Sequence, residues 1–398
     1  MLRVAVALVL LFAFAGGALG ESRATPSVIE VVSPGTPVFA EPSAKSRRIG
    51  TLASGTRLLA LGDRVPHETC AEGFVRVERG FLCARHVRPS SLPPHAVQLP
   101  AMREGALLPY RYAFVKIDGT LAHRRAEDYF EGVGAFALGK GYGVVVKGEV
   151  EHFGRRFIQL RDGHLVSADA VARVRGSDFE GVEIAPGEPF DVAFAKKPGA
   201  LVKDAAGRTL RRLGRREVVR VEAVEPRRVR LRDGGFVDRD DLHLPRLLPP
   251  PEGVFAGEIF VDVDLAEQTL VVYRGARPIF ATLVSTGRGG KQSETREGVF
   301  PIWAKLAATD MRDVHRTDVV RNYFIENVPW VQFFDGAIAL HAAFWHDDFG
   351  RPRSHGCVNL SPKDARRVFE LTRPVLPPGW EAILVDPEDR PTLVRVHR

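Results

Sequence analysis

The chain has 398 residues, more than one ordinary hydrophobic core supports, and this length predicts about two to four domains. Its hydrophobic fraction of 45% and charged fraction of 26% are typical of globular proteins, which argues against a disordered chain and a multispan membrane protein. The net charge of +7 favours an acidic partner such as a nucleic acid, a membrane surface or an anionic cell-wall polymer.

Residues 1–20 have the layout of a secretory signal peptide. Arg3 precedes an unbroken run of apolar and small residues over 4–15, and Ala18 and Gly20 lie three and one residues before the predicted cut. The run is too short to span a bilayer, and no cysteine follows it to carry a lipid. We therefore expect export to a periplasm or cell wall, which makes nucleic acid a poor partner. An uncleaved membrane anchor is the alternative.

Proline-rich segments divide the rest of the chain. Residues 88–100 and 245–251 have the composition of stiff connectors. A weak internal repeat relates LRDGHLV (160–166) to LRDGGFV (231–237), and residues 77–82 are a looser copy. These patterns predict four folded units, over residues 27–90, 101–180, 187–247 and 252–388.

The first three units are expected to be small β-barrels. Residues 37–42 (PVFAEP), 50–52 (GTL) and 73–75 (GFV) resemble bacterial SH3-like domains, and the internal repeat extends this interpretation to the second and third units. The resemblance implies wall binding or positioning, with spacers that bind no ligand as the alternative. Lys and Arg outnumber Asp and Glu in residues 21–251, which favours anionic cell-envelope polymers as partners.

The chain has three cysteines, so at least one lacks an intrachain disulfide partner. Cys70 and Cys83 lie within one predicted module on neighbouring strands, and in an exported chain we favour a disulfide over two buried thiols. Neither has a nearby histidine suited to catalysis. Cys357 is the cysteine left over.

The C-terminal unit is expected to be mainly β, with one short helix. Three strands are predicted at its start, over residues 258–264, 269–273 and 278–286. Ser361 offers an N-cap hydroxyl, Pro362 suits the first helical position, and Asp364 follows three residues after the cap. A helix should therefore run to about Leu371.

The chemistry-bearing residues lie just before this helix. His341 ends an apolar strand, and the run Ser354-His355-Gly356-Cys357 follows 12 intervening residues later. Cysteine attacks as the thiolate, so a working nucleophile needs a base or cation nearby, and both histidines are candidates. Backbone amides around Gly356 and Cys357 are suited to an oxyanion hole. The alternatives are an inert buried thiol, or a metal site made by His341, His346, His355 and Cys357.

Residues 258–386 resemble the L,D-transpeptidase (YkuD-type) catalytic domain. That family's signature is a histidine, a gap of a dozen or more residues, and then Ser/Thr-His-Gly-Cys-apolar-Asn/Arg, and residues 354–359 (SHGCVN) fit every position downstream of His341. VSTG (284–287) and TREGVF (295–300) are similar to the family's early strand and its Thr-Pro-x-Gly turn, with Arg296 in place of proline. The resemblance implies a β-sandwich-like fold.

The resemblance also implies a reaction on peptidoglycan stem peptides. Cys357 would attack the bond before D-alanine in a tetrapeptide stem, and an amine of a second stem would capture the thioester as a 3-3 cross-link, with no metal or cofactor. His341 would act as general base and proton donor, its tautomer held by a carbonyl near Ala342. His355 would tune the thiolate and the oxyanion hole, to which Gly356 would contribute its backbone.

Neighbouring residues are given lesser roles. Ser354 and Asn359 are expected to brace the turn through side-chain hydrogen bonds to backbone. His346 is expected to be exposed, because two aspartates follow it. The candidates for substrate binding are Arg353, Trp330, Phe333 and Trp345. For the three aromatic residues, packing in the core is the alternative.

Two other functions compete with cross-linking. An L,D-carboxypeptidase would use the same site and let water take the thioester. A wall-binding protein with a dormant catalytic domain is the other, although the complete pair of His341 and Cys357 argues against it.

Overall fold

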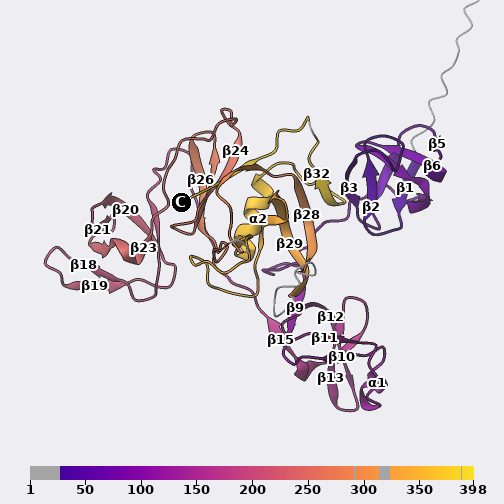
Figure 1. The fold of residues 1–398 in the computed structure, drawn as a ribbon, viewed down its shortest axis with the longest axis horizontal. Helices are drawn as coiled ribbons and strands as arrows, with labels where there is room; N and C mark the ends of the chain where they lie inside the picture. Colours follow the sequence, from indigo (N-terminus) through magenta and orange to yellow (C-terminus); the bar gives the residue numbers. More distant parts are fainter. Residues whose placement is uncertain (1–26, 291–292, 313–322, 387) are drawn as a thin grey trace, which may run out of the picture.

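The computed structural model describes residues 27–290, 293–312, 323–386 and 388–398. The predicted signal peptide, residues 1–20, lies outside the described residues. The fold is mainly β, as predicted, with several sheets and few helices (Figure 1). Among the described residues, no helix is long and apolar enough to cross a membrane.

Residues 27–90 form a small β unit. Its strands are β1 (Ser27–Val31), β2 (Thr36–Phe39), β3 (Arg48–Leu52), β4 (Arg57–Ala60), β5 (Val65–His67), β6 (Cys70–Val77), β7 (Gly80–Cys83) and β8 (Val87–Ser90). β1 pairs with β4 and β8, and the others follow the order β3-β2-β7-β6-β5. A disulfide between Cys70 and Cys83 joins β6 to β7, with the Cα atoms 5.8 Å apart.

The next two predicted units are also built from short strands. In the second these are β9 (Arg111–Val115), β10 (Thr120–Ala122), β11 (Phe136–Leu138), β12 (Gly143–His152), β13 (Arg155–Leu160), β14 (Leu165–Ser167) and β15 (Val171–Val174), with the short helix α1 (Ala126–Phe130). In the third they are β17 (Val192–Ala195), β18 (Leu201–Lys203), β19 (Thr209–Arg212), β20 (Val218–Val224), β21 (Arg228–Leu231), β22 (Phe236–Asp238) and β23 (Leu242–His243).

The three units share a structural repeat. In each, a hairpin leads into a 3-10 turn, and the strand after the turn pairs antiparallel with the unit's first long strand. The turns are Ala84–His86, Ala168–Ala170 and Arg239–Asp241. The pairs are β1 with β8, β9 with β15 and β17 with β23. The sequence repeat therefore marks a repeated hairpin and turn.

The C-terminal domain has two sheets with a helix between them (Figure 1). Its strands are β24 (Ile259–Asp264), β25 (Thr269–Arg274), β26 (Arg277–Leu283), β27 (Gly298–Pro301), β28 (Ala304–Arg312), β29 (Phe324–Asp335), β30 (Ile338–Ala342), β31 (Val358–Leu360), β32 (Trp380–Leu384) and β33 (Leu393–His397). One core cluster joins Val261 and Val272 of the first sheet, Leu340 and Val358 of the second, and Val368 of the helix.

The predicted helix is α2 (Pro362–Leu371). Ser361 Oγ accepts a hydrogen bond from the Asp364 amide, and Pro362 opens the first turn, as the sequence indicated. The Asp364 carboxylate also has a side-chain hydrogen bond with Ser361. It accepts from the Gly181 amide at 2.8 Å and from the Thr282 hydroxyl, so it joins α2 to a neighbouring strand and to the chain between the second and third units.

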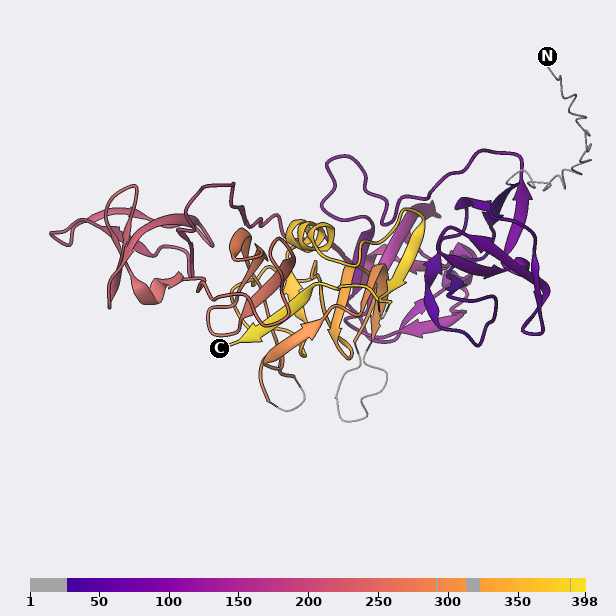
Figure 2. The same ribbon diagram turned by 90° about the horizontal axis from the view of Figure 1, so that it is seen from above.

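β-pairing attaches the N-terminal units to the C-terminal domain. β3 pairs with β32, β12 pairs with β29, and β16 (Val182–Glu183) pairs with β26. The first and third units lie at opposite ends of the molecule, with the C-terminal domain between them (Figures 1 and 2). The segment between the second and third units therefore forms an edge strand of the C-terminal domain.

Candidate active site

The parallel pairing of β30 and β31 brings the two motif segments together. Leu340 lies opposite Val358, and His341 lies opposite Asn359. Paired residues of parallel strands share a face, so His341 and Asn359 project to one side of the sheet. Cys357 lies in the turn immediately before β31, next to this pair of strands. The Cys357 thiol also hydrogen-bonds the backbone of Ala339, two residues before His341.

The opposite face of these strands packs against α2, and this decides which aromatics can approach His341. Trp330 is 3% exposed and belongs to the core cluster beneath α2, so its expected place in the substrate groove is wrong. Phe333 and Trp345 pack instead with the cluster that contains Ala339, on the face that also bears His341. These two aromatics are therefore placed to border the site.

A network of hydrogen bonds fixes the turn before Cys357. Ser354 Oγ accepts from the Gly356 amide at 3.0 Å and donates to the Cys357 carbonyl, so Ser354 braces the turn in the way the sequence suggested. Because the Gly356 N–H is used here, it is not available to an oxyanion. The candidate donor is then the Cys357 amide, which corrects the expected role of Gly356.

Gly356 serves the geometry of the turn. Its φ is +126°, a conformation that side-chain-bearing residues rarely adopt, and an added Cβ would lie 2.6 Å from Ile338 Cδ1. Thr295 holds the same peptide from the other side: its hydroxyl donates to the Gly356 carbonyl at 2.7 Å and accepts from the Gly287 amide at 2.9 Å. The sequence had indicated only a turn at Thr295, so this contact was missed.

Burial keeps the histidine and the cysteine neutral. Burial lowers the pKa of His341 to about 4, although its hydrogen bond to the Ala342 carbonyl opposes the shift. Burial raises the pKa of Cys357 to about 11. His341 Nδ1 lies 3.0 Å from the Ala342 carbonyl oxygen, which can only accept, so Nδ1 carries the proton and Nε2 has the free lone pair. At neutral pH the pair is thus a thiol and a neutral imidazole.

His355 has a different setting. Its side chain is exposed, and its ring stacks on Tyr323 with centroids 5.8 Å apart. The expected role of His355 in tuning the thiolate stays a prediction.

The loop between the two motif segments covers the site. Trp345 lies over His341 with ring centroids 5.7 Å apart. His346 Nε2 lies 3.1 Å from the Asn359 side-chain amide, and His346 Nδ1 accepts from the Asp348 amide. His346 is therefore half-buried rather than exposed, and Asn359 contacts this histidine rather than the turn, so both expectations were wrong.

Arg353 is an exposed residue of this loop. Its Nε lies 3.4 Å from a carboxylate oxygen of Asp348, and its backbone amide donates to the Thr286 carbonyl. The expected contact of Arg353 with substrate stays a prediction.

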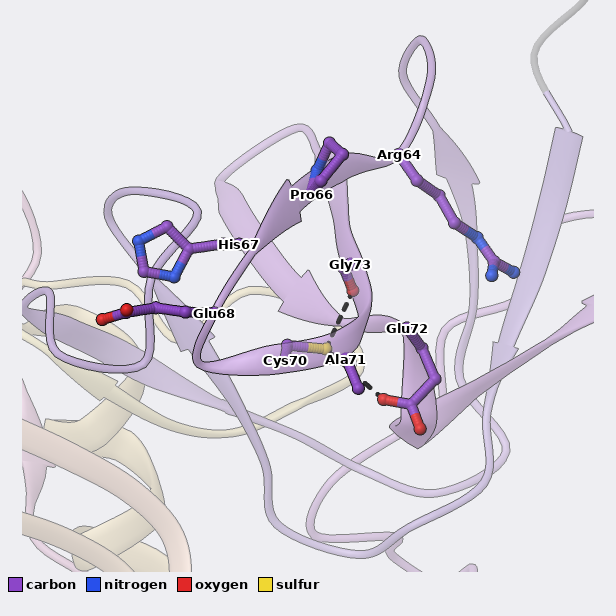
Figure 3. A pocket seen from close by; sticks show the side chains of 8 residues that line it. All are labelled: Arg64, Pro66, His67, Glu68, Cys70, Ala71, Glu72 and Gly73. Atoms are coloured by element: carbon purple, nitrogen blue, oxygen red, sulfur yellow. Dashed lines mark hydrogen bonds between the residues drawn. The ribbon is translucent and has the colours of Figure 1, made fainter.

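The alternative metal site lacks a clustered donor set. Among the described residues, no three of His341, His346, His355 and Cys357 bring their ligand atoms within 4.8 Å of one another. The group that does so is Cys70, Glu72 and Cys83, but both of its sulfurs are bonded in the disulfide. A cavity of about 470 Å³ lies beside this disulfide, lined by residues of β5 and β6 and the segments next to them (Figure 3), and it contains no residue of the C-terminal domain.

Comparisons with known proteins identify the C-terminal domain. Residues 258–385 match the family model of YkuD, described as the L,D-transpeptidase catalytic domain. A search of curated proteins found no match.

Solved structures similar to this chain include three L,D-transpeptidases. The Enterococcus faecium C442S mutant is 20% identical over 36% of this chain and 50% of its own, with a TM-score of 0.27. The Stackebrandtia nassauensis enzyme is 26% identical over 38% and 59%, with a TM-score of 0.26. L,D-transpeptidase 3 from Mycobacterium tuberculosis, in complex with a faropenem-derived adduct, is 16% identical over 35% and 60%, with a TM-score of 0.28. The chain thus spans about half the length of the first of these. Residues 258–385 are a YkuD-type L,D-transpeptidase catalytic domain.

Proposed function

We propose that this protein is an exported cysteine L,D-transpeptidase that forms 3-3 cross-links between peptidoglycan stem peptides. The observation that supports the proposal is the parallel pairing of β30 with β31, which brings the strand of His341 beside the strand that follows Cys357, with a neutral imidazole available as base. Export rests on the signal-like sequence of residues 1–20.

The proposed reaction begins with proton transfer. As Cys357 Sγ attacks the carbonyl carbon of the bond before D-alanine, its proton passes to His341 Nε2. The Cys357 amide faces the developing oxyanion. When the tetrahedral intermediate collapses, the C–N bond breaks, His341 returns the proton to the departing amine, and D-alanine leaves a thioester on Cys357.

The second half runs the same steps in reverse. The side-chain amine of another stem attacks the thioester carbonyl, and His341 takes a proton from the attacking nitrogen. The C–S bond then breaks, the cysteine is restored as a thiol, and the two stems are joined by an amide. The half-buried rings of Phe333 and Trp345 give the donor stem an apolar border, and Arg353 is a candidate to meet a stem carboxylate.

A direct experiment incubates the mature protein with a disaccharide-tetrapeptide and identifies the products by mass spectrometry. A cross-linked dimer that disappears in Cys357→Ala supports transfer. Free D-alanine without a dimer would instead indicate hydrolysis by the same site. Products unchanged in Cys357→Ala would contradict both reactions and leave wall binding as the function.

A second measurement tests the nucleophile without a stem peptide. We expect faropenem to add covalently to Cys357, with the adduct visible by intact mass and absent in Cys357→Ala. Release of D-alanine without any adduct would contradict this expectation.

The basic units at the N-terminus are proposed to contact anionic cell-envelope polymers. Binding of the protein to isolated sacculi should then weaken as salt is raised, because exposed charges are screened. Binding that does not depend on salt would remove this electrostatic account.

A further inference from the structure

One buried arginine links the third N-terminal unit to the active-site loop. The two terminal guanidinium nitrogens of Arg216 contact the two carboxylate oxygens of Asp347, at 2.6 and 2.8 Å. The guanidinium also donates a hydrogen bond of 3.0 Å to the Asp347 carbonyl. Its side chain is only 9% exposed, and the guanidinium carbon lies 4.7 Å from the ring centre of Phe179 and 5.8 Å from that of Phe349. A bidentate, ring-stacked pair of this kind has one defined geometry.

Other residues of the third unit hold the same loop. Arg215 pairs with the Asp347 carboxylate at 2.6 Å. His243 fills the space beside Gly350, whose φ is +96°, so that an added Cβ there would lie 2.6 Å from His243 Nε2. Phe194 joins the core cluster that includes Phe349. The third unit therefore contacts the loop over most of residues 347–350.

The segment held in this way also touches His341 and Asn359, the two residues that lie opposite each other on β30 and β31. Asp347 follows His346, which contacts Asn359 on the strand after Cys357. Trp345 lies on His341. A displacement of Asp347 would consequently move both contacts, through one and two peptide bonds respectively.

We propose that Arg216 is a positioning residue for the transpeptidase reaction, holding the loop that seats Trp345 on His341 and His346 on Asn359. The inference rests on the proposed function and adds to it that the third unit borders the active site. This role of the third unit differs from the roles expected from sequence, which were binding to the cell wall and spacing, because the Arg216 side chain is buried in the contact with the loop.

Arg216→Met tests the proposal, since it removes the charge and keeps much of the apolar stem. Arg220→Met is the matched control, because Arg220 makes an Arg–Asp pair with Asp191 inside the same unit. We expect kcat for D-alanine release to fall about 10- to 100-fold in Arg216→Met, with KM within about threefold. Arg216→Lys, which keeps the charge but loses the bidentate fork, should recover only part of the rate.

The ring signals of His341 and His346 in NMR titrations of the full chain give a readout that does not need substrate. Burial lowers the pKa of both to about 4. The charges around His346 are those of Arg353, Asp348, Asp347 and Arg216, so its titration should shift upward when Arg216 is lost. A shift of the His341 pKa toward its ordinary value near 6.5 reports that His341 has become less buried, because burial is the main cause of its low pKa and Arg216 is not among the groups acting on it. His346 is the charged neighbour that acts on His341, and protonation of His346 lowers the His341 pKa, so it cannot produce an upward shift.

Each outcome of these two measurements either supports or contradicts the proposed role of Arg216. Reduced kcat with an upward shift of the His341 titration, both absent in Arg220→Met, supports the proposal. An Arg216→Met protein with kcat within twofold of the control, or with the His341 titration unchanged, overturns it. If Arg216→Met fails to fold, Asp347→Asn applies the same criteria from the other side of the pair. If the wild-type protein releases no D-alanine, the proposed function fails, and the His341 titration alone decides the role of Arg216.

Discussion

Thr295→Val tests whether one hydroxyl supports the turn that presents Cys357. The substitution keeps the shape of the side chain and removes two hydrogen bonds, one to the Gly356 carbonyl and one from the Gly287 amide. Each partner left unsatisfied in a buried place costs about 1–3 kcal/mol, so for two partners the free energy of unfolding should fall by about 2–6 kcal/mol. The Gly356 peptide, held at φ +126° by these contacts, would then be free to rotate, and kcat for D-alanine release should fall by about tenfold or more.

The assay is urea denaturation of the full chain, followed by tryptophan fluorescence, beside D-alanine release at saturating substrate. All four tryptophans lie in the C-terminal domain, so the fluorescence reports on the unfolding of that part of the chain. Thr295→Ser is the control, because it keeps the hydroxyl and loses one methyl group, at a cost of about 1 kcal/mol. A Thr295→Val protein as stable and as active as Thr295→Ser would refute the reasoning.

Two further predictions concern buried titratable groups. Both His341 and His346 have a folded pKa near 4, below the value of about 6.5 for an unfolded chain, so the unfolded state binds more protons between these values. The contribution of these two histidines to stability should therefore decline as pH falls from 6.5 to 4. The denaturation midpoints of wild type and His346→Gln should converge over that range. Lys305 Nζ donates to the Phe369 and Thr372 carbonyls at the end of α2, and burial lowers its pKa to about 7. Lys305→Met should lower the free energy of unfolding by about 1–3 kcal/mol and remove the rise in stability that wild type shows between pH 7 and 10.5. A pH profile of stability that is the same in Lys305→Met and wild type would count against the assignment.

Local sequence patterns predicted several elements of the C-terminal domain. The helix α2 was predictable because its start signals, Ser361 and Pro362, act within one turn. The parallel pairing of β30 with β31, which brings the two motif segments together, was not predictable from local patterns, since none of them states which strands pair. The parallel register of β30 and β31 depends on contacts with the rest of the sheet.

The failures have long-range causes. Trp330 has a φ of +57°, and this irregularity, in a strand whose register also shifts, cannot be read from alternation of apolar residues. His346 looked exposed because two aspartates follow it. Asp347, however, pairs with Arg215 and Arg216, which lie more than a hundred residues earlier in the chain, so composition near His346 gave no sign of its burial.

The same long-range pairing gives the basic surplus of the N-terminal units a second explanation. Each unit places an arginine on an acid of the C-terminal domain: Arg47 on Asp386, Arg161 on Asp310 and Arg216 on Asp347. The C-terminal domain has slightly more acidic than basic residues, so part of the charge imbalance is complementarity between the units. These pairs are not equivalent, because the exposed ones are screened by salt and are worth little. In the Arg216 pair the arginine side chain is 9% exposed and the Asp347 side chain is 40% exposed, so this pair is screened less than the other two, and it is also the pair that reaches the loop over His341. Moderate salt should therefore weaken attraction to an anionic polymer while leaving the geometry of the active site in place.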